Sequence, residues 1–460
     1  MKIYFLLVHL LLTLINSEEY SGAYNLILDD EKSTIDGEIL TSDPIKGVSI
    51  KAGENIVHYE SEYANVEGYG ESTSQSEWHT KEECNKEKLV EITEPGTYIV
   101  SGKLNGQLSI SIPDADENAD DNTKKERYAK LILKNVDITC NVAPALIFYK
   151  AYEIDETEYE DNEIKIEYND AYNLDFTNAG ARIIIADDSE NTIKGSHVAK
   201  CYKYTVNNDS SITVTTKKRA KYDGAFYSKV SMFISAEKEG NGILNIIADN
   251  EGLDTEKHLL IEKGNIYISS NDDGINTNEE GGSVTLLKGG KIVINGGLGT
   301  EGDGIDSNGY LIINGGELIS AGKPQADSGM DADLGIVING GTSIAVGTTM
   351  DNASNKSTQL AMNLHFSSQV EKTKTLTIKD TNGKVLISFN PSKAGFINNG
   401  EIRGYIGAII SHPDFKLNTT YYLYLDDSQL GYGGNNDRDP GNNVERKHED
   451  NPLEKPGNNT

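Results

Sequence analysis

A short acidic phrase built around a glycine recurs through the middle of the chain. Its copies are Asp223-Gly224-Ala225, Glu251-Gly252-Leu253-Asp254, Asp272-Asp273-Gly274-Ile275, Asp303-Gly304-Ile305-Asp306 and Ser328-Gly329-Met330-Asp331-Ala332-Asp333. The glycines are 28, 22, 30 and 25 residues apart. Carboxylate oxygens are hard ligands, and calcium binds about six to eight oxygens at about 2.3–2.6 Å. The phrase therefore predicts calcium binding if the fold brings its copies together.

The predicted calcium ligands are the Asp side chains of these phrases: Asp223, Asp254, Asp272, Asp273, Asp303, Asp306, Asp331 and Asp333. If the copies stack as coils of a solenoid, equivalent residues lie about 4.8 Å apart. Like charges at that distance raise one another's pKa unless a cation binds between them. The alternative is that each phrase is an ordinary β-turn, because Asp-Gly is frequent in turns for conformational reasons alone. Five copies in series favour calcium over that alternative.

A second phrase, Ile-Asn-Gly-Gly, alternates with the acidic one and begins at Ile294, Ile313 and Ile338. Repeats of about 20–50 residues are typical of solenoids, and the short apolar runs between the phrases are typical of strands. The chain is therefore predicted to be all-β: a right-handed parallel β-helix with a small antiparallel C-terminal cap. The strand candidates in its regular part are Arg182–Ala186, Ser211–Thr215, Ser231–Ser235, Ile243–Ala248, Asn265–Ser269, Ser283–Leu287, Lys291–Ile294, Tyr310–Ile313, Gly335–Ile338 and Thr342–Val346.

The chain divides into five predicted segments. Residues 1–17 are predicted to be a signal peptide, because Lys2 precedes an apolar run that ends before Ser17. That run is short for a membrane span of about 20 residues, so an N-terminal anchor is the less favoured alternative. Residues 18–88 form an acidic lead-in, 89–350 the β-helix, 351–430 its cap and 431–460 a disordered tail. An Asn382-Gly383 turn predicts a hairpin in the cap, and Tyr152–Tyr172 is predicted to be an exposed insertion.

The formal net charge of −30 excludes several classes of partner. Nucleic acids and anionic membranes are bound through basic surfaces, and none is evident here. We expect no nucleic-acid partner, no membrane insertion, and a secreted, extracellular monomer. The three cysteines, Cys84, Cys140 and Cys201, allow one disulfide. Secretion agrees with five Asn-X-Ser/Thr sequons, at Asn208, Asn352, Asn355, Asn418 and Asn458.

No catalytic residue is predicted from the sequence. A polysaccharide lyase needs a base beside a calcium-bound uronate, and none of the lysines of the coils, at Lys257, Lys263, Lys288 and Lys291, belongs to an acidic phrase. Aromatic rings that stack on sugars are also scarce in the regular coils, which hold only Phe233, Tyr267 and Tyr310 between Ser231 and Met350. The carbohydrate-contacting residues therefore stay unassigned.

From about Leu89 to Leu425 the chain resembles the carbohydrate-binding domain-containing proteins of cellulolytic anaerobes. The resemblance is carried by Ile92-Thr93-Glu94-Pro95-Gly96-Thr97-Tyr98, Leu133-Lys134-Asn135-Val136-Asp137-Ile138, Asp188-Ser189-Glu190-Asn191-Thr192, Asp223-Gly224-Ala225-Phe226-Tyr227-Ser228-Lys229, the Asp-Gly-Ile coils and Ser411-His412-Pro413-Asp414-Phe415. It implies a parallel β-helix similar to pectate lyases, bound calcium at the acidic phrases, and binding to cellulose and acidic plant polysaccharides without established lyase activity. Glu251 and Asp327 depart from the family's pattern, and so does the Tyr152–Tyr172 stretch.

These observations favour one hypothesis over two others. The first is a secreted, non-catalytic protein that binds plant cell-wall polysaccharide, cellulose or pectic uronans, through a calcium-stabilised β-helix. The second is a calcium-dependent polysaccharide lyase. The third is a structural surface protein in which calcium only stiffens the solenoid. An enzymatic function is thus the less favoured hypothesis. Failure to bind any glycan would favour the third hypothesis over the first two.

Overall fold

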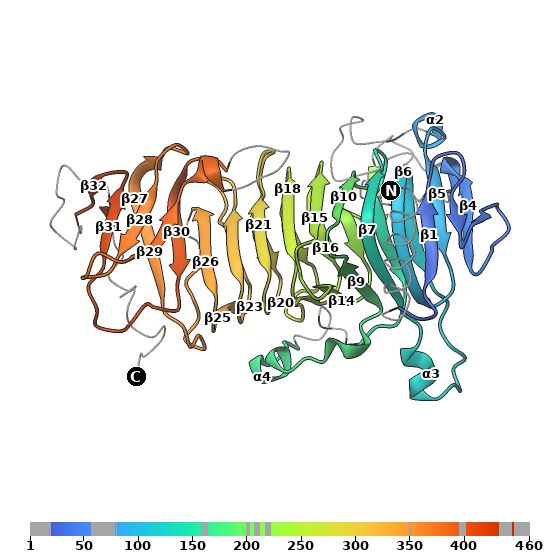
Figure 1. The fold of residues 1–460 in the computed structure, drawn as a ribbon, viewed down its shortest axis with the longest axis horizontal. Helices are drawn as coiled ribbons and strands as arrows, with labels where there is room; N and C mark the ends of the chain where they lie inside the picture. The colour runs from blue at the N-terminus through green and yellow to red at the C-terminus, as the bar shows by residue number, and fades with distance from the viewer. Residues whose placement is uncertain are drawn as a thin grey trace, which may run out of the picture.

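Strands make up nearly all of the regular structure in this computed structural model. The structure describes residues 20–56, 79, 81–157, 159, 164–198, 222–348, 351–394 and 402–431, and the backbone of 203–206, 212–216 and 444–445. Pairing joins 27 strands into one mixed sheet, and the strands follow one another along the long axis of the molecule (Figure 1). The predicted signal peptide and almost all of the predicted tail lie outside the described residues.

Most of the sheet consists of three ladders of parallel strands. The first ladder contains β10 (Glu190–Gly195), β15 (Ile243–Ala248), β18 (Asn265–Ser270), β21 (Lys291–Asn295), β24 (Glu317–Ala321) and β26 (Thr342–Gly347). The second contains β8 (Leu146–Lys150), β13 (Gly224–Ser228), β16 (Glu251–Thr255), β19 (Ile275–Thr277) and β22 (Ile305–Ser307). The third contains β9 (Ala181–Ile185), β14 (Met232–Ala236), β17 (Leu259–Ile261), β20 (Val284–Leu287), β23 (Tyr310–Ile313) and β25 (Gly335–Ile338).

Consecutive strands visit the three ladders in a fixed order. From β13 to β24 the chain passes through the second, third and first ladders and then begins again. From β13 to β21 each strand therefore pairs with the strand three places further on, about one repeat later in the sequence. β23 and β24 pair with β25 and β26, two places further on. The sequence-predicted strands at Ile243–Ala248, Tyr310–Ile313 and Gly335–Ile338 are confirmed with these bounds.

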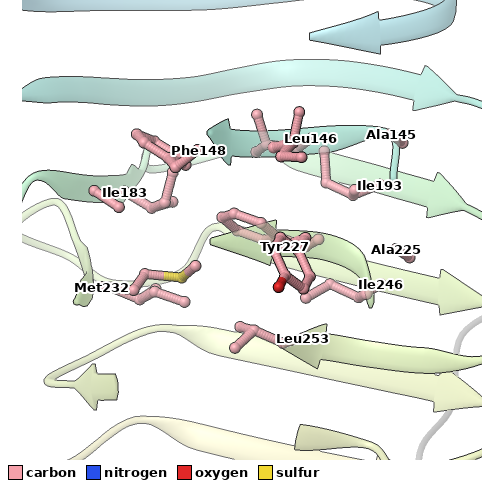
Figure 2. Packing of buried hydrophobic residues seen from close by; sticks show 14 of the residues in the cluster. Ala145, Leu146, Phe148, Ile183, Ile193, Ala225, Tyr227, Met232, Ile246 and Leu253 are labelled. Atoms are coloured by element: carbon pink, nitrogen blue, oxygen red, sulfur yellow. The ribbon is translucent and has the colours of Figure 1, made fainter. Parts of the chain in front are cut away.

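Apolar residues at equivalent positions stack from strand to strand and form the core. Leu253 pairs in register with Ile275, which pairs with Ile305, and all three side chains are fully buried. Figure 2 shows the same packing nearer the N-terminus, where Leu146, Phe148, Ile183, Ile193, Met232, Ile246 and Leu253 gather between strands of different ladders. Because Val and Ile pack well on a pleated surface, two or three of them per short strand are enough for a continuous core.

The N-terminal strands extend this sheet. They are β1 (Tyr24–Leu28), β2 (Thr34–Ile35), β3 (Glu38–Ile39), β4 (Val48–Ala52), β5 (Lys88–Ile92), β6 (Gly96–Ser111) and β7 (Ala129–Thr139). β1 and β5 both pair with β6 in parallel, and β4 pairs with β5 antiparallel. Residues of the predicted lead-in thus belong to the main sheet. Short helices flank these strands: α2 (Lys81–Cys84), α3 (Asp121–Lys125) and the 3-10 turn Gly53–Asn55.

The C-terminal strands are antiparallel. β30 (Tyr405–Ser411) pairs with β26 and with β27 (Ala361–Val370), which also pairs with β33 (Val444–Glu445). A separate four-stranded sheet contains β28 (Leu376–Lys379), β29 (Val385–Phe389), β31 (Tyr422–Leu425) and β32 (Ser428–Gln429). β28 and β29 form the predicted hairpin, with Gly383 in the left-handed region at φ 83°. A second small sheet pairs β11 (Lys203–Val206) with β12 (Ile212–Thr216). A 3-10 turn spans Pro391–Lys393.

The segment Tyr152–Tyr172, which we call the tyrosine-rich segment, lies against the third ladder. It contains α4 (Tyr168–Tyr172) and is followed by the 3-10 turn Phe176–Asn178 (Figure 1). Tyr159 and Ile166 are each only 7% exposed because they pack on the outward side chains of the ladder, among them Leu286. The prediction of an exposed insertion is therefore wrong for these residues, although Tyr172 is 43% exposed. The segment covers an apolar face that the strands alone would leave open to water.

Candidate functional site

The acidic phrases lie where the chain enters the strands of the second ladder. Asp254 is in β16, Asp306 is in β22, and both pair in register with Asn276 of β19. Asp254 and Asp306 therefore lie in strands and not in β-turns. Asp273 and Asp303 precede β19 and β22 by two residues. The second ladder thus presents acidic and amide side chains at matching heights of successive strands.

One row, acidic except for its last member, lies at the entry to these strands, and we call it the bend row: Glu251, which begins β16, and Asp273, Asp303 and Ser328. The amide of Gly274 donates to the Asp303 carbonyl at 3.0 Å, and that of Gly304 donates to the Ser328 carbonyl at 2.9 Å. Side chains join the row as well, because Asp273 Oδ1 accepts the Asp303 amide at 2.6 Å. The predicted stack of Asp273 and Asp303 is present.

A second row follows the strands, and we call it the strand row: Asp254, Asn276 and Asp306, which lie in strands, and Asp331, which does not. The Asp331 amide donates to the Ile305 carbonyl at 2.8 Å, which places Asp331 one repeat beyond Asp306. The two rows touch, since Asn276 Nδ2 donates to Glu251 Oε1 at 3.0 Å across buried surroundings. The site is therefore a double row rather than the single stack expected from the sequence.

Burial and like charge together raise the pKa values of Asp273, Asp303 and Asp331. Burial raises the pKa of Asp273 well above its usual range, and Glu251 and Asp306 add to the effect. Burial likewise raises the pKa of Asp303 to about 8, with Asp331 acting in the same direction. The pKa of Asp331 is raised by burial and then by Asp351. Carboxyl groups in this arrangement either hold protons at neutral pH or need a cation.

The glycines of the phrases permit close packing between ladders. A Cβ on Gly274 would collide with Cγ2 of Ile294 and with the carbonyl oxygen of Gly304. A Cβ on Gly304 would collide with Ser320 Oγ in the same way. Neither Gly274 nor Gly304 has a positive φ. Glycine is therefore required at these positions for space and not for turn geometry.

The remaining predicted ligands lie beside the two rows. Asp223 is buried and its carbonyl accepts the Glu251 amide at 3.2 Å, at the N-terminal end of the bend row. Asp272 directly precedes Asp273 and acts on its pKa through its charge. Asp333 is exposed and lies two residues beyond Asp331. The structure thus places two of the eight predicted residues in strands of the second ladder and the other six beside it, at different depths.

No complete metal centre is formed by the side chains as they stand. Within the described residues, no group of three or more His, Cys, Asp or Glu side chains is arranged to hold a metal ion. The donor chemistry does fit calcium, because the rows consist of carboxyl and amide oxygens. Asn276 Oδ1 is also buried without a hydrogen-bond partner in the described part of the chain, and a bound cation would satisfy it.

A third row lies at and just past the far ends of the same strands, and we call it the rim row: Tyr149, Lys229, Glu256, Asn278, Asn308 and Asp333. Backbone hydrogen bonds fix the order of these residues. The Lys229 amide donates to the Phe148 carbonyl and the Glu256 amide donates to the Ser228 carbonyl, both at 2.9 Å. Tyr149 and Asp333 are exposed and the other four are half-buried. Sequence reasoning missed this row, and the signal that marks it is a polar residue two places after each strand-row position.

The lysines considered from the sequence are engaged elsewhere. Lys257 pairs with Glu279 at 2.5 Å, and Lys263 Nζ donates to the carbonyls of Glu237 and Lys238. Lys291 lies on the first ladder opposite Glu317, at 3.6 Å. None of these three lysine side chains is joined to the bend row or the strand row by a contact within the described residues.

The cysteines do not carry the site. Cys84 and Cys140 are buried free thiols, so they are not paired with each other, and Cys201 lies outside the described residues. Cys140 Sγ donates to Glu87 Oε2 at 2.9 Å. Burial raises the pKa of the Cys140 thiol well above its usual value, and the charge of Glu87 acts in the same direction, which disfavours the reactive thiolate.

The fold and the site define a class: an all-β protein with an extended polar face on stacked strands. A family model described as "Carbohydrate-binding domain-containing protein" matches residues 156–402, more than half of the 460-residue chain. The chain belongs to this family. The matched range contains all of the predicted calcium ligands and begins within the tyrosine-rich segment. No curated protein and no solved structure matches the chain.

Among the described residues, no helix is both long and apolar enough to span a membrane.

Proposed function

We propose that this protein is a secreted, non-catalytic carbohydrate-binding protein that attaches to plant cell-wall polysaccharide, cellulose or pectic uronans. The observation that carries the proposal is the double row of acidic residues with the accessible rim row beside it. Membership of a carbohydrate-binding family supports binding to a polysaccharide. An extended row suits a polymer, because six strand positions about 4.8 Å apart span about 24 Å.

Calcium is the proposed cofactor of the two acidic rows. Asp273 and Asp303 would supply carboxylates from the bend row, and Asp306 and Asp331 from the strand row, with Asn276 as an amide ligand. Without a cation these carboxyl groups repel, which agrees with the raised pKa values of Asp273, Asp303 and Asp331. A bound calcium ion would draw facing members of the two rows together and would neutralise a surface that otherwise repels uronate polymers.

The proposed scaffold is a right-handed parallel β-helix, with each ladder as one of its faces. The fixed order in which the chain visits the three ladders supports this arrangement. In such a scaffold each coil contacts only its neighbours, so one residue type can be repeated on one face at a regular spacing. This is how the sequence repeat would become a linear binding surface.

Catalysis is not part of the proposal. A lyase would need a basic side chain positioned over a calcium-bound uronate. Of the four lysines singled out from the sequence, Lys257 and Lys291 pair instead with Glu279 and Glu317, and Lys263 donates to backbone carbonyls. Binding without turnover is therefore the function that the named contacts favour, with the structural surface protein as the outcome if no glycan binds.

The test is a pull-down on insoluble cellulose and on polygalacturonate, with calcium and with chelator, while the absorbance of unsaturated uronate products is followed. Calcium-dependent retention without new absorbance is the expected result. New absorbance would instead make the protein a lyase. Failure to bind either polymer would favour the structural role, provided that the protein is folded by thermal unfolding.

A further inference from the structure

An exposed aromatic ring begins the rim row at its N-terminal end. Tyr149 lies in β8 and is 36% exposed. Lys229 follows β13. Its backbone amide donates a hydrogen bond to the Phe148 carbonyl, which places Lys229 directly beside Tyr149. Lys229 Nζ lies 4.8 Å from the centroid of the Tyr149 ring and 5.1 Å from that of Tyr222. The Tyr149 ring and the Lys229 ammonium group thus lie together at the N-terminal end of the rim row.

Two buried tyrosines hold this pair in place from behind. The rings of Tyr149 and Tyr222 meet edge to face with centroids 6.0 Å apart, and Tyr222 meets Tyr227 in the same way at 5.3 Å. Tyr222 and Tyr227 are each 2% exposed. Tyr227 is fixed in turn, because its hydroxyl donates to Glu256 Oε1 at 2.6 Å. The exposed ring is therefore pre-organised, which lowers the cost of ordering it on binding.

Lys229 is the basic member of an otherwise acidic and neutral rim row. In the described part of the chain, no carboxylate oxygen lies within ion-pair distance of its Nζ, and its contacts are with aromatic faces. A neutral sugar does not require an ammonium group at this place. A sugar carboxylate would be repelled by Glu256 and Asp333 further along the row, and would find its favourable partner at Lys229.

We propose that Tyr149 and Lys229 form a terminal subsite of the glycan surface, in which the Tyr149 ring stacks on a sugar ring and Lys229 selects an acidic sugar over a neutral one. The aromatic face would contact either kind of sugar through its apolar C–H face. The ammonium group would form a charge-assisted hydrogen bond only with the acidic kind. The inference rests on the proposed function, because it names the selective end of that same surface.

The experiment measures the affinity of oligogalacturonate and of a cello-oligosaccharide of equal length, in calcium, for the full chain and its variants. Lys229→Gln is expected to weaken oligogalacturonate binding about tenfold, the size of one charged hydrogen bond, and to leave the neutral sugar unchanged. Lys229→Arg should keep the selectivity. Tyr149→Ala should weaken both ligands about two- to tenfold.

The matched control is Lys379→Gln, because Lys379 Nζ also lies over a tyrosine ring, that of Tyr424, at 4.6 Å, but on the C-terminal sheet. It should change neither affinity, and the melting temperature of each variant shows that it is folded. If the wild type binds and the Lys229 and Tyr149 variants bind equally well, the subsite is wrong and the proposed function stands. Equal weakening of both sugars by Lys229→Gln refutes the selectivity. A wild type that binds no glycan removes both proposals.

Discussion

Asp303 joins two neighbouring repeats through its side chain, because its Oδ1 accepts the backbone amide of Ser328 at 2.6 Å. An equivalent hydrogen bond is formed one repeat earlier, where Asp273 Oδ1 accepts the Asp303 amide. Each carboxyl group of the bend row is therefore held by the next repeat, at the bend where the chain enters the second ladder. The row therefore contributes to the packing of neighbouring repeats.

The chelated protein should lose stability as the pH rises from about 4 to about 8. The pKa of Asp303 is about 8 in the folded chain and about 3.9 in an unfolded one, so the folded state binds more protons in that window. Its stabilising contribution is complete below pH 4 and is lost as the pH passes 8. Melting temperatures measured in chelator from pH 4 to pH 9 check this, with Asp303→Asn expected to flatten the slope. Stability that rises across the window would contradict the assignment.

Calcium should raise the melting temperature. At a concentration 100 times Kd, binding to the folded state alone stabilises by about 2.7 kcal/mol. Asp303→Ala with Asp306→Ala removes one member from each row and should abolish most of the increase. Lys374, which pairs with Asp426 at 2.9 Å on the C-terminal sheet, supplies the control variant Lys374→Ala. A double variant with the native calcium response would refute the role of both residues.

Calcium binding should release protons near pH 7. Asp273 and Asp303 have raised pKa values, and a metal ligand must give up its proton. Calorimetric titration in two buffers with different ionisation enthalpies measures the number released. A heat that is the same in both buffers would mean that the ion binds elsewhere or that these groups are already ionised.

Gly274→Ala should destabilise the protein by about 1–3 kcal/mol, the usual cost of forcing extra atoms into a packed interior. Its new Cβ would meet Ile294 and the Gly304 carbonyl. Gly383→Asn is the matched control, because nothing lies within 4 Å of a Cβ there and Asn tolerates a left-handed backbone. Denaturant unfolding of both variants tests the claim. Equal stability of Gly274→Ala and the wild type would mean that the ladders are not packed as described.

The regular strands could be predicted from sequence because their apolar residues recur on a simple pattern. Ile-Asn-Gly-Gly marks turns in the structure too, with Gly316 and Gly341 at φ 87° and 80°. The strands of the second ladder were missed, since Gly, Asp and Asn are depleted in strands and β19 and β22 have only three residues each. Pairing with strands on both sides overrides that preference.

The candidate site could be predicted in part for the same reason. The repeat identified Asp273 and Asp303 as neighbours, because equivalent residues of a repeat stack. It did not show that Asn276 would touch Glu251, since that contact depends on the register between two repeats of unequal length. Nor could it show that Tyr149, far upstream, begins the rim row or that Ile166 is buried on the third ladder.

The most direct test of the central claim is a calorimetric titration of oligogalacturonate into the wild type and into Asp303→Asn with Asp306→Asn, each with and without calcium. The account predicts binding by the wild type in calcium, loss of that binding in chelator, and weak binding by the variant in either condition. Wild-type and variant affinities that are equal and independent of calcium would show that the acidic rows are not the glycan-binding surface.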